Sequence, residues 1–189
     1  FTSFLTFPLL IGGVMVAPAL FRLLFKSEWW DAIPFFQLLC MGGCFTVLTA
    51  INNNFIKVSG RSSGILRIEI VKMALTAVSI ALLARESVLA MVAGLMAVRG
   101  VVHLINIYYT QRYTGYGMWA QLCDTVPYLL LAMVMAAAVW SVGLVVDKPW
   151  LLLPLQIVAG AAVYTLLAYA TGSKILKDAI RLLLKKETL

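Results

Sequence analysis

Long apolar runs alternate with short polar breaks along almost the whole chain. Six of these runs reach membrane-spanning length, because about 20 helical residues at about 1.5 Å each cross a hydrocarbon core of about 30 Å. They occupy residues 1–25, 32–55, 64–83, 88–110, 126–146 and 150–171. The pattern predicts an all-α fold, a polytopic transmembrane helix bundle with six spans that fills residues 1–173.

Two of the breaks contain residues that are typical of helix ends. Three consecutive asparagines, Asn52 to Asn54, stand where the second apolar run stops, so we expect that helix to end near Phe55. Residues 110–124 form an amphipathic stretch that predicts an interfacial segment before the fifth helix. Asp124 or Thr125 would then cap this helix, with Pro127 in its first turn.

The composition excludes an ordinary soluble domain. Hydrophobic residues make up 62% of the 189 positions and charged residues only 12%, and the mean hydropathy is +0.96. These values are typical of a multi-pass membrane protein. The chain also starts at Phe1 inside an apolar run, which suggests a piece of a longer protein.

The net charge of +7 comes from basic residues that gather in short loops and in the last sixteen residues. Residues 174–189 place apolar side chains at helical spacing against five basic ones, which predicts an amphipathic tail on an anionic membrane surface. Six spans put both ends of the chain on one side. The basic residues of that side are Lys57, Arg61, Arg67, Arg112, Lys174, Lys177, Arg181, Lys185 and Lys186. The other side has Arg22, Lys26, Arg85 and Lys148, balanced by Glu28, Asp31, Glu86 and Asp147. The positive-inside rule therefore predicts that both ends are cytoplasmic, and this charge distribution disfavours nucleic-acid binding.

No constellation for catalysis or metal binding stands out in the sequence. The chain has one histidine, and its three cysteines are not arranged as a metal motif. It also lacks the nucleophile-elbow, metalloprotease and phosphate-loop motifs. We therefore expect neither an enzyme nor a resident cofactor or metal.

The residues most suggestive of function are the ionisable groups inside apolar segments. Arg99 stands at the middle of the run 88–110, far from both headgroup layers, and His103 follows one helical turn later. The preceding run has Arg67, Glu69 and Lys72 in its first half. Buried charges of this kind must face protein or water, and they often mark a substrate or ion path.

Two interpretations of these groups remain open. In the first, Arg99, Lys72 and Arg67 line a cationic cavity for an anion such as a phosphate or pyrophosphate, and His103 and Glu69 couple transport to ions. In the second, Glu69 forms an interhelical ion pair with Arg99 or Lys72 that only fixes the packing of the helices.

Four runs of sequence carry a family resemblance: TFPLLIGGVMVAPALFRLLF, IPFFQLLCMGG, NNNFIKVSGRSS and DTVPYLLLAMVM, at residues 6–25, 33–43, 52–63 and 124–135. With the Trp29 and Trp30 turn, they resemble the carboxy-terminal part of Wzx-type polysaccharide (O-antigen) flippases, in the multidrug/oligosaccharidyl-lipid/polysaccharide exporter superfamily. The family often has Gly where this chain has Lys26.

The resemblance implies a two-lobed exporter in the bacterial inner membrane, of which this chain would form most of the second lobe. Such proteins move undecaprenyl-pyrophosphate-linked oligosaccharides between leaflets by alternating access, for polysaccharide and lipopolysaccharide synthesis. The partners would then be the lipid-linked oligosaccharide, the membrane lipids and the missing N-terminal half. The alternatives are a multidrug/cation antiporter of the same superfamily, which would place acidic groups in its cavity, and a non-transporting membrane scaffold.

Overall fold

The computed structural model describes residues 2–146 and 148–172, and all regular elements in this part of the chain are helical. They are α1 (Thr2–Leu24), the short 3-10 helix η1 (Ser27–Ala32), α2 (Ile33–Val58), α3 (Ser62–Leu83), α4 (Val88–Thr114), α5 (Met118–Val145) and α6 (Pro149–Ala170). The predicted amphipathic tail, residues 174–189, lies outside the described residues.

Five segments of the described chain are long and apolar enough to cross a membrane: α1, η1 with α2, α4, α5 and α6. The sequence predicted a sixth span over residues 64–83, and a helix, α3, does form there. Arg67, Glu69 and Lys72 make α3 too charged to meet the same criterion, so the count of six spans is not confirmed. Five apolar helices place the protein among multi-pass helical membrane proteins.

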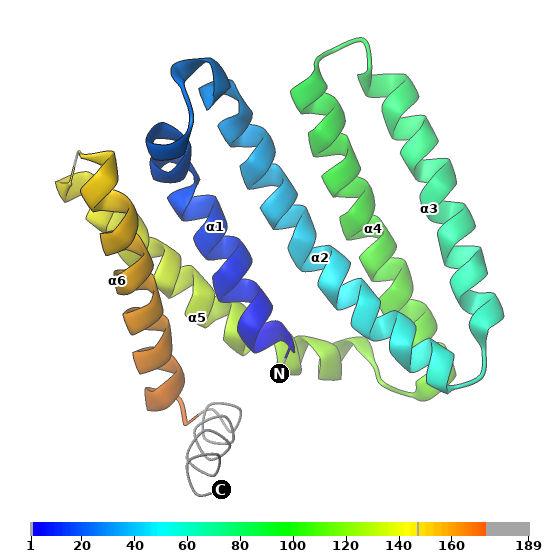
Figure 1. Ribbon diagram of the computed structural model, residues 1–189. Coiled ribbons are helices and arrows are strands. Elements are labelled where there is room, and N and C mark those ends of the chain that lie inside the picture. The colour runs from blue at the N-terminus through cyan, green and yellow to red at the C-terminus, as the bar shows by residue number, and fades with distance from the viewer. Residues whose placement is uncertain (1, 147, 173–189) are drawn as a thin grey trace, which may run out of the picture.

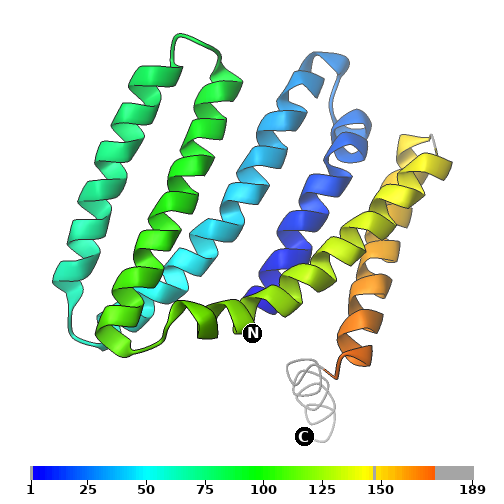
Figure 2. The same ribbon diagram turned by 180° about the vertical axis from the view of Figure 1, so that it is seen from behind.

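The helices alternate in direction and form two groups that share a boundary at α1 and α2 (Figures 1 and 2). In one group α1 packs against α5 and α6, and in the other α4 packs between α2 and α3. Helices α4 and α5 are close at their connection and diverge toward the other end of the bundle, as Figure 2 shows.

Each group has its own buried core. Phe7 of α1, Val139 of α5 and Tyr164 of α6 belong to the first core, and the Tyr164 hydroxyl donates to the carbonyl of Phe4 at 2.7 Å. The second core consists of Ile56 of α2, Ile68 of α3 and Val102 of α4.

A close approach joins α2 to α4. A Cβ atom at Gly42 would lie only 1.9 Å from the sulfur of Met96, so a side chain at this position of α2 would have to displace Met96. Small residues permit such approaches between membrane helices. Gly42 thus brings α4 close to α2 at the level of Arg99, whose Nη1 atom would be 3.4 Å from the same Cβ.

The start predicted for the fifth helix is wrong. Helix α5 begins at Met118 and continues through Pro127, so Asp124 and Thr125 lie within the helix and cap nothing. The chain breaks earlier because Gly115 takes the left-handed conformation (φ 74°), which ends α4 after Thr114. The predicted interfacial stretch is therefore the end of α4, a short connection and the first turns of α5.

The predicted end of the second helix is also too early. Helix α2 runs to Val58, and Asn52 is buried inside it. An asparagine at this depth contributes to an interior surface and does not hydrate a helix end.

Candidate functional site

A groove of about 690 Å³ is bounded by α1, α2, α4 and α5. Its wall is mostly apolar, with Phe7 and Met15 from α1, Phe45 and Leu48 from α2, and Met133 from α5. Its lining includes residues of both α4 and α5, the two helices that diverge in Figure 2. An apolar groove of this size fits a lipid chain or another large apolar group.

Polar side chains gather at one end of this groove. Ser3 stands at the start of α1, Asn52 near the end of α2, and Gln121 and Asp124 near the start of α5, and all of them line the groove. These helix ends lie at the same end of the bundle (Figure 1). The groove is therefore largely apolar, with these polar side chains at one end.

A tyrosine and an aspartate meet at the polar end. The Tyr116 hydroxyl donates to the Asp124 carboxylate, and Nε2 of Gln121 donates to the Tyr116 carbonyl at 3.1 Å. The Phe55 ring lies 5.3 Å from the Tyr116 ring. These contacts fix the connection between α4 and α5 against the end of α2.

Burial, together with the hydrogen bond to Asp124 and the negative charge of that carboxylate, raises the pKa of Tyr116 to about 12. Tyr116 therefore remains a hydrogen-bond donor at neutral pH. Because the folded pKa lies above the ordinary value of 10, the native state holds this proton more tightly than the unfolded state. The resulting stabilisation is complete below pH 10 and is lost as the pH rises toward about 12.

We predict that Tyr116 ionises near pH 12 in an alkaline titration, well above the ordinary tyrosine value of 10. The signal of Tyr116 is the difference in tyrosinate absorbance between the protein and the Tyr116→Phe variant. The midpoint of this difference should move to lower pH in the Asp124→Asn variant, because the negative charge beside Tyr116 is gone. The Tyr108→Phe variant is the control, since Tyr108 is exposed and distant in sequence from Asp124. A Tyr116 midpoint near 10 in the unchanged protein would contradict the contact.

Arg99 and His103 lie on the α2–α4 seam. The Nη1 atom of Arg99 donates to the Thr46 hydroxyl at 3.2 Å, and one turn along α4 the Nδ1 atom of His103 is 3.4 Å from the Thr49 hydroxyl. His103 lines the groove, but Arg99 is not among its lining residues. The expectation that these two residues share one face of a helix is confirmed by their two contacts with α2.

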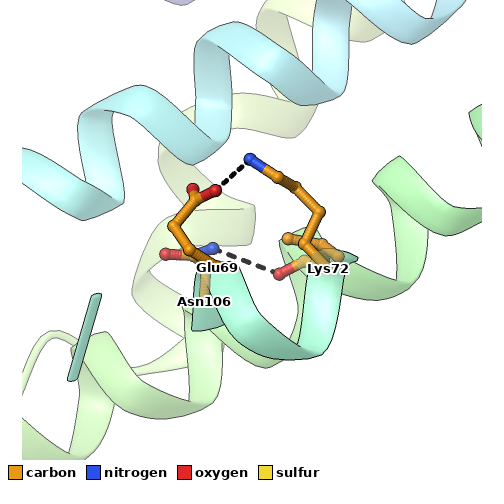
Figure 3. Close-up of polar contacts among 4 residues, drawn as sticks. Glu69, Lys72 and Asn106 are labelled. Atoms are coloured by element: carbon orange, nitrogen blue, oxygen red, sulfur yellow. Dashed lines mark hydrogen bonds and ion pairs between the residues drawn. The ribbon is translucent and has the colours of Figure 1, made fainter. Parts of the chain in front are cut away.

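The charges of α3 lie elsewhere. Glu69 and Lys72 form an ion pair on this helix, with side chains that are 41% and 42% exposed (Figure 3). Figure 3 also includes Asn106 of α4, which is buried and donates to the carbonyl of Val102 at 3.2 Å. Neither Glu69 nor Lys72 lines the groove.

Arg67 lines a second, polar pocket at the end of the bundle, together with Arg61 and Arg112. The five candidate residues from the sequence therefore occupy three places: the α2–α4 seam, the surface of α3 and the pocket at the bundle end. A cationic cavity formed by Arg99, Lys72 and Arg67, and ion coupling by His103 and Glu69, stay predictions.

Sequence reasoning missed the polar end of the groove. Asp124 was interpreted as a helix cap, and Tyr116 and Gln121 were not singled out. The spacing of Gln121 and Asp124 could have predicted that they lie together, because they are three residues apart and share one face of a helix that begins before them. This was missed because the predicted start of α5 came after both residues.

The described residues contain no group of three or more His, Cys, Asp or Glu side chains that could hold a metal ion. No protein-family model, no curated protein and no solved structure matches the chain. The fold and the groove thus define a class, a multi-pass helical membrane protein with a largely apolar groove between its helices.

Proposed function

We propose that this chain is the carboxy-terminal portion of a Wzx-type flippase, which moves an undecaprenyl-pyrophosphate-linked oligosaccharide across the bacterial inner membrane. The observation that carries the proposal is the groove between α1, α2, α4 and α5. Its apolar wall suits a polyprenyl chain, and its polar end offers hydroxyl, amide and carboxylate groups suited to sugar hydroxyls. The sequence resemblance supports the same function.

In this proposal Arg99 receives the pyrophosphate when the lobes rearrange. Within the described chain, the Arg99 guanidinium has one hydrogen-bond partner, the neutral hydroxyl of Thr46. Its other N–H groups therefore remain available to bind an anion. His103 follows one turn closer to the polar end and lines the groove. The missing N-terminal half would supply the opposite wall, with alternating access between the lobes and both ends of this chain in the cytoplasm. Lys72 and Arg67 remain secondary candidates for the anion.

The test is flipping of a fluorescent undecaprenyl-pyrophosphate oligosaccharide by the full-length parent protein in proteoliposomes. We expect Arg99→Ala to slow flipping at least about tenfold, because a charge-assisted hydrogen bond to the pyrophosphate is lost. Arg85→Ala is the control, since Arg85 is exposed in the turn between α3 and α4. Unchanged flipping in a folded Arg99→Ala protein would remove Arg99 from the site, and no flipping by the unchanged parent would refute the function.

One observation favours a second candidate, the multidrug/cation antiporter. Asp124 is an acidic group on the groove, whereas no lysine or arginine of the described chain lines it. A lipophilic cation would fit this charge distribution. In that case Asp124→Asn would abolish transport of a fluorescent lipophilic cation in the same proteoliposomes, while Arg99→Ala would leave it unchanged. A scaffold would transport neither substrate.

A further inference from the structure

A second pocket, of about 410 Å³, lies at the end of the bundle where α2 ends, α3 begins and α4 ends. It is separate from the groove and shares no lining residue with it. Three arginines line it together with a serine and two tyrosines: Arg61, Arg67, Arg112, Ser63, Tyr109 and Tyr113. Three positive charges thus converge on one concave surface.

Within the part of the chain that the structure describes, no acidic side chain balances these charges. No Asp or Glu of residues 2–146 and 148–172 lines the pocket, and the ion pair of these residues, Glu69 with Lys72, includes none of the three arginines. The Arg61 guanidinium lies over the Tyr113 ring at 5.2 Å, which orients it without neutralising it. Guanidinium groups are always protonated in proteins, so the lining of this pocket carries a net positive charge.

The chemistry of the pocket matches a phosphate group. Arginine presents a planar fork of donors that fits two phosphate oxygens at once, and Ser63 adds a hydroxyl donor. The first turn of α3 adjoins the pocket and has no side-chain cap, which leaves backbone N–H groups available there. The position at the ends of membrane-length helices is the level of lipid headgroups.

We propose that this arginine pocket binds a phosphate group at the membrane surface. The phosphate has two sources that share this chemistry, the headgroup of an anionic membrane lipid and a soluble phosphate. The arginine pocket is separate from the groove, so its phosphate binding does not depend on the transport function. Arg67 then belongs to a peripheral anion site at the end of the bundle.

The experiment measures binding by the full-length protein in nanodiscs of zwitterionic lipid. In one arm a fluorescent phosphatidylglycerol is titrated into the nanodiscs. In the other arm inorganic phosphate is titrated, and its binding is measured by calorimetry and by its competition with the fluorescent lipid. Arg112→Ala is compared with Lys57→Ala, which removes an equal charge at the same end of the bundle from a side chain outside the pocket. Arg112→Lys keeps the charge and loses the planar fork.

We expect Arg112→Ala to weaken binding of the fluorescent lipid about tenfold and Arg112→Lys to weaken it less, with Lys57→Ala within about twofold of the unchanged protein. Lipid binding without phosphate binding identifies the headgroup as the source. Arginine-dependent binding of inorganic phosphate identifies a soluble phosphate, and either result supports the pocket. Equal losses in Arg112→Ala and Lys57→Ala, or no binding in either arm, would overturn it. Both substituted residues, Arg112 and Lys57, are exposed, so the variants are expected to fold.

Discussion

Replacing Gly42 with leucine is expected to destabilise the protein by about 1–3 kcal/mol. A Cβ atom at this position would already lie 1.9 Å from the Met96 sulfur and 3.2 Å from its terminal methyl carbon. A leucine adds further carbons at a point where α2 and α4 are in direct contact, so it must separate the helices or force Met96 out of its place. The measurement is the free energy of unfolding from an SDS titration in mixed micelles.

A compensating substitution identifies the cause of this loss. Met96→Ala removes the side chain that collides, so the double variant Gly42→Leu/Met96→Ala should recover more than half of the lost stability. Gly100→Ala is the matched control on α4, because a Cβ there would meet only the Phe45 ring, at an ordinary 3.9 Å. A double variant as unstable as Gly42→Leu would show that the α2–α4 contact is not the source.

The second large effect is expected for Ile68→Ala, which should destabilise the protein by about 2 kcal/mol. Ile68 is only 1% exposed and packs with Ile56 and Val102 in the core between α2, α3 and α4. In a soluble protein such a truncation costs about 2–5 kcal/mol. We expect the lower end, because the surrounding lipid is as apolar as the core and the loss comes mainly from missing packing contacts.

Ile70→Ala separates packing from helix propensity in the same experiment. Ile70 lies two residues further along α3 and is 57% exposed, so the same truncation should change stability by less than about 0.5 kcal/mol. Equal losses for Ile68→Ala and Ile70→Ala would mean that α3 is held by its own helical structure and not by the core with α2 and α4.

These substitutions also test how the candidate groups are held in place. Gly42 brings α4 against α2 at the level of Arg99, and the two threonine contacts of Arg99 and His103 depend on that approach. In the proposed flippase, a Gly42 variant that still folds should therefore slow transport more than Ile68→Ala, which truncates the separate core of Ile56, Ile68 and Val102.

The sequence by itself determined the helical class and most of the helix positions. An apolar run of about 20 residues can satisfy its backbone groups inside a membrane only as a helix, so composition and length decide the structure locally. The observed helices α1, α4 and α6 accordingly lie close to the predicted ranges 1–25, 88–110 and 150–171. The early start of α5 was missed because Asp124 and Pro127 suit a helix start and also occur inside a helix.

Only the tertiary structure decided which polar groups meet. Helical spacing predicted that Arg99 and His103 share a face, since that relation is local. It did not predict that this face meets Thr46 and Thr49, nor that Arg67 joins Arg61 and Arg112 in a separate pocket. Lipid-facing and protein-facing residues are similarly apolar, so the sequence carries little information about which helices become neighbours. The groove and the arginine pocket depend on those pairings, and for that reason they become visible only in the folded chain.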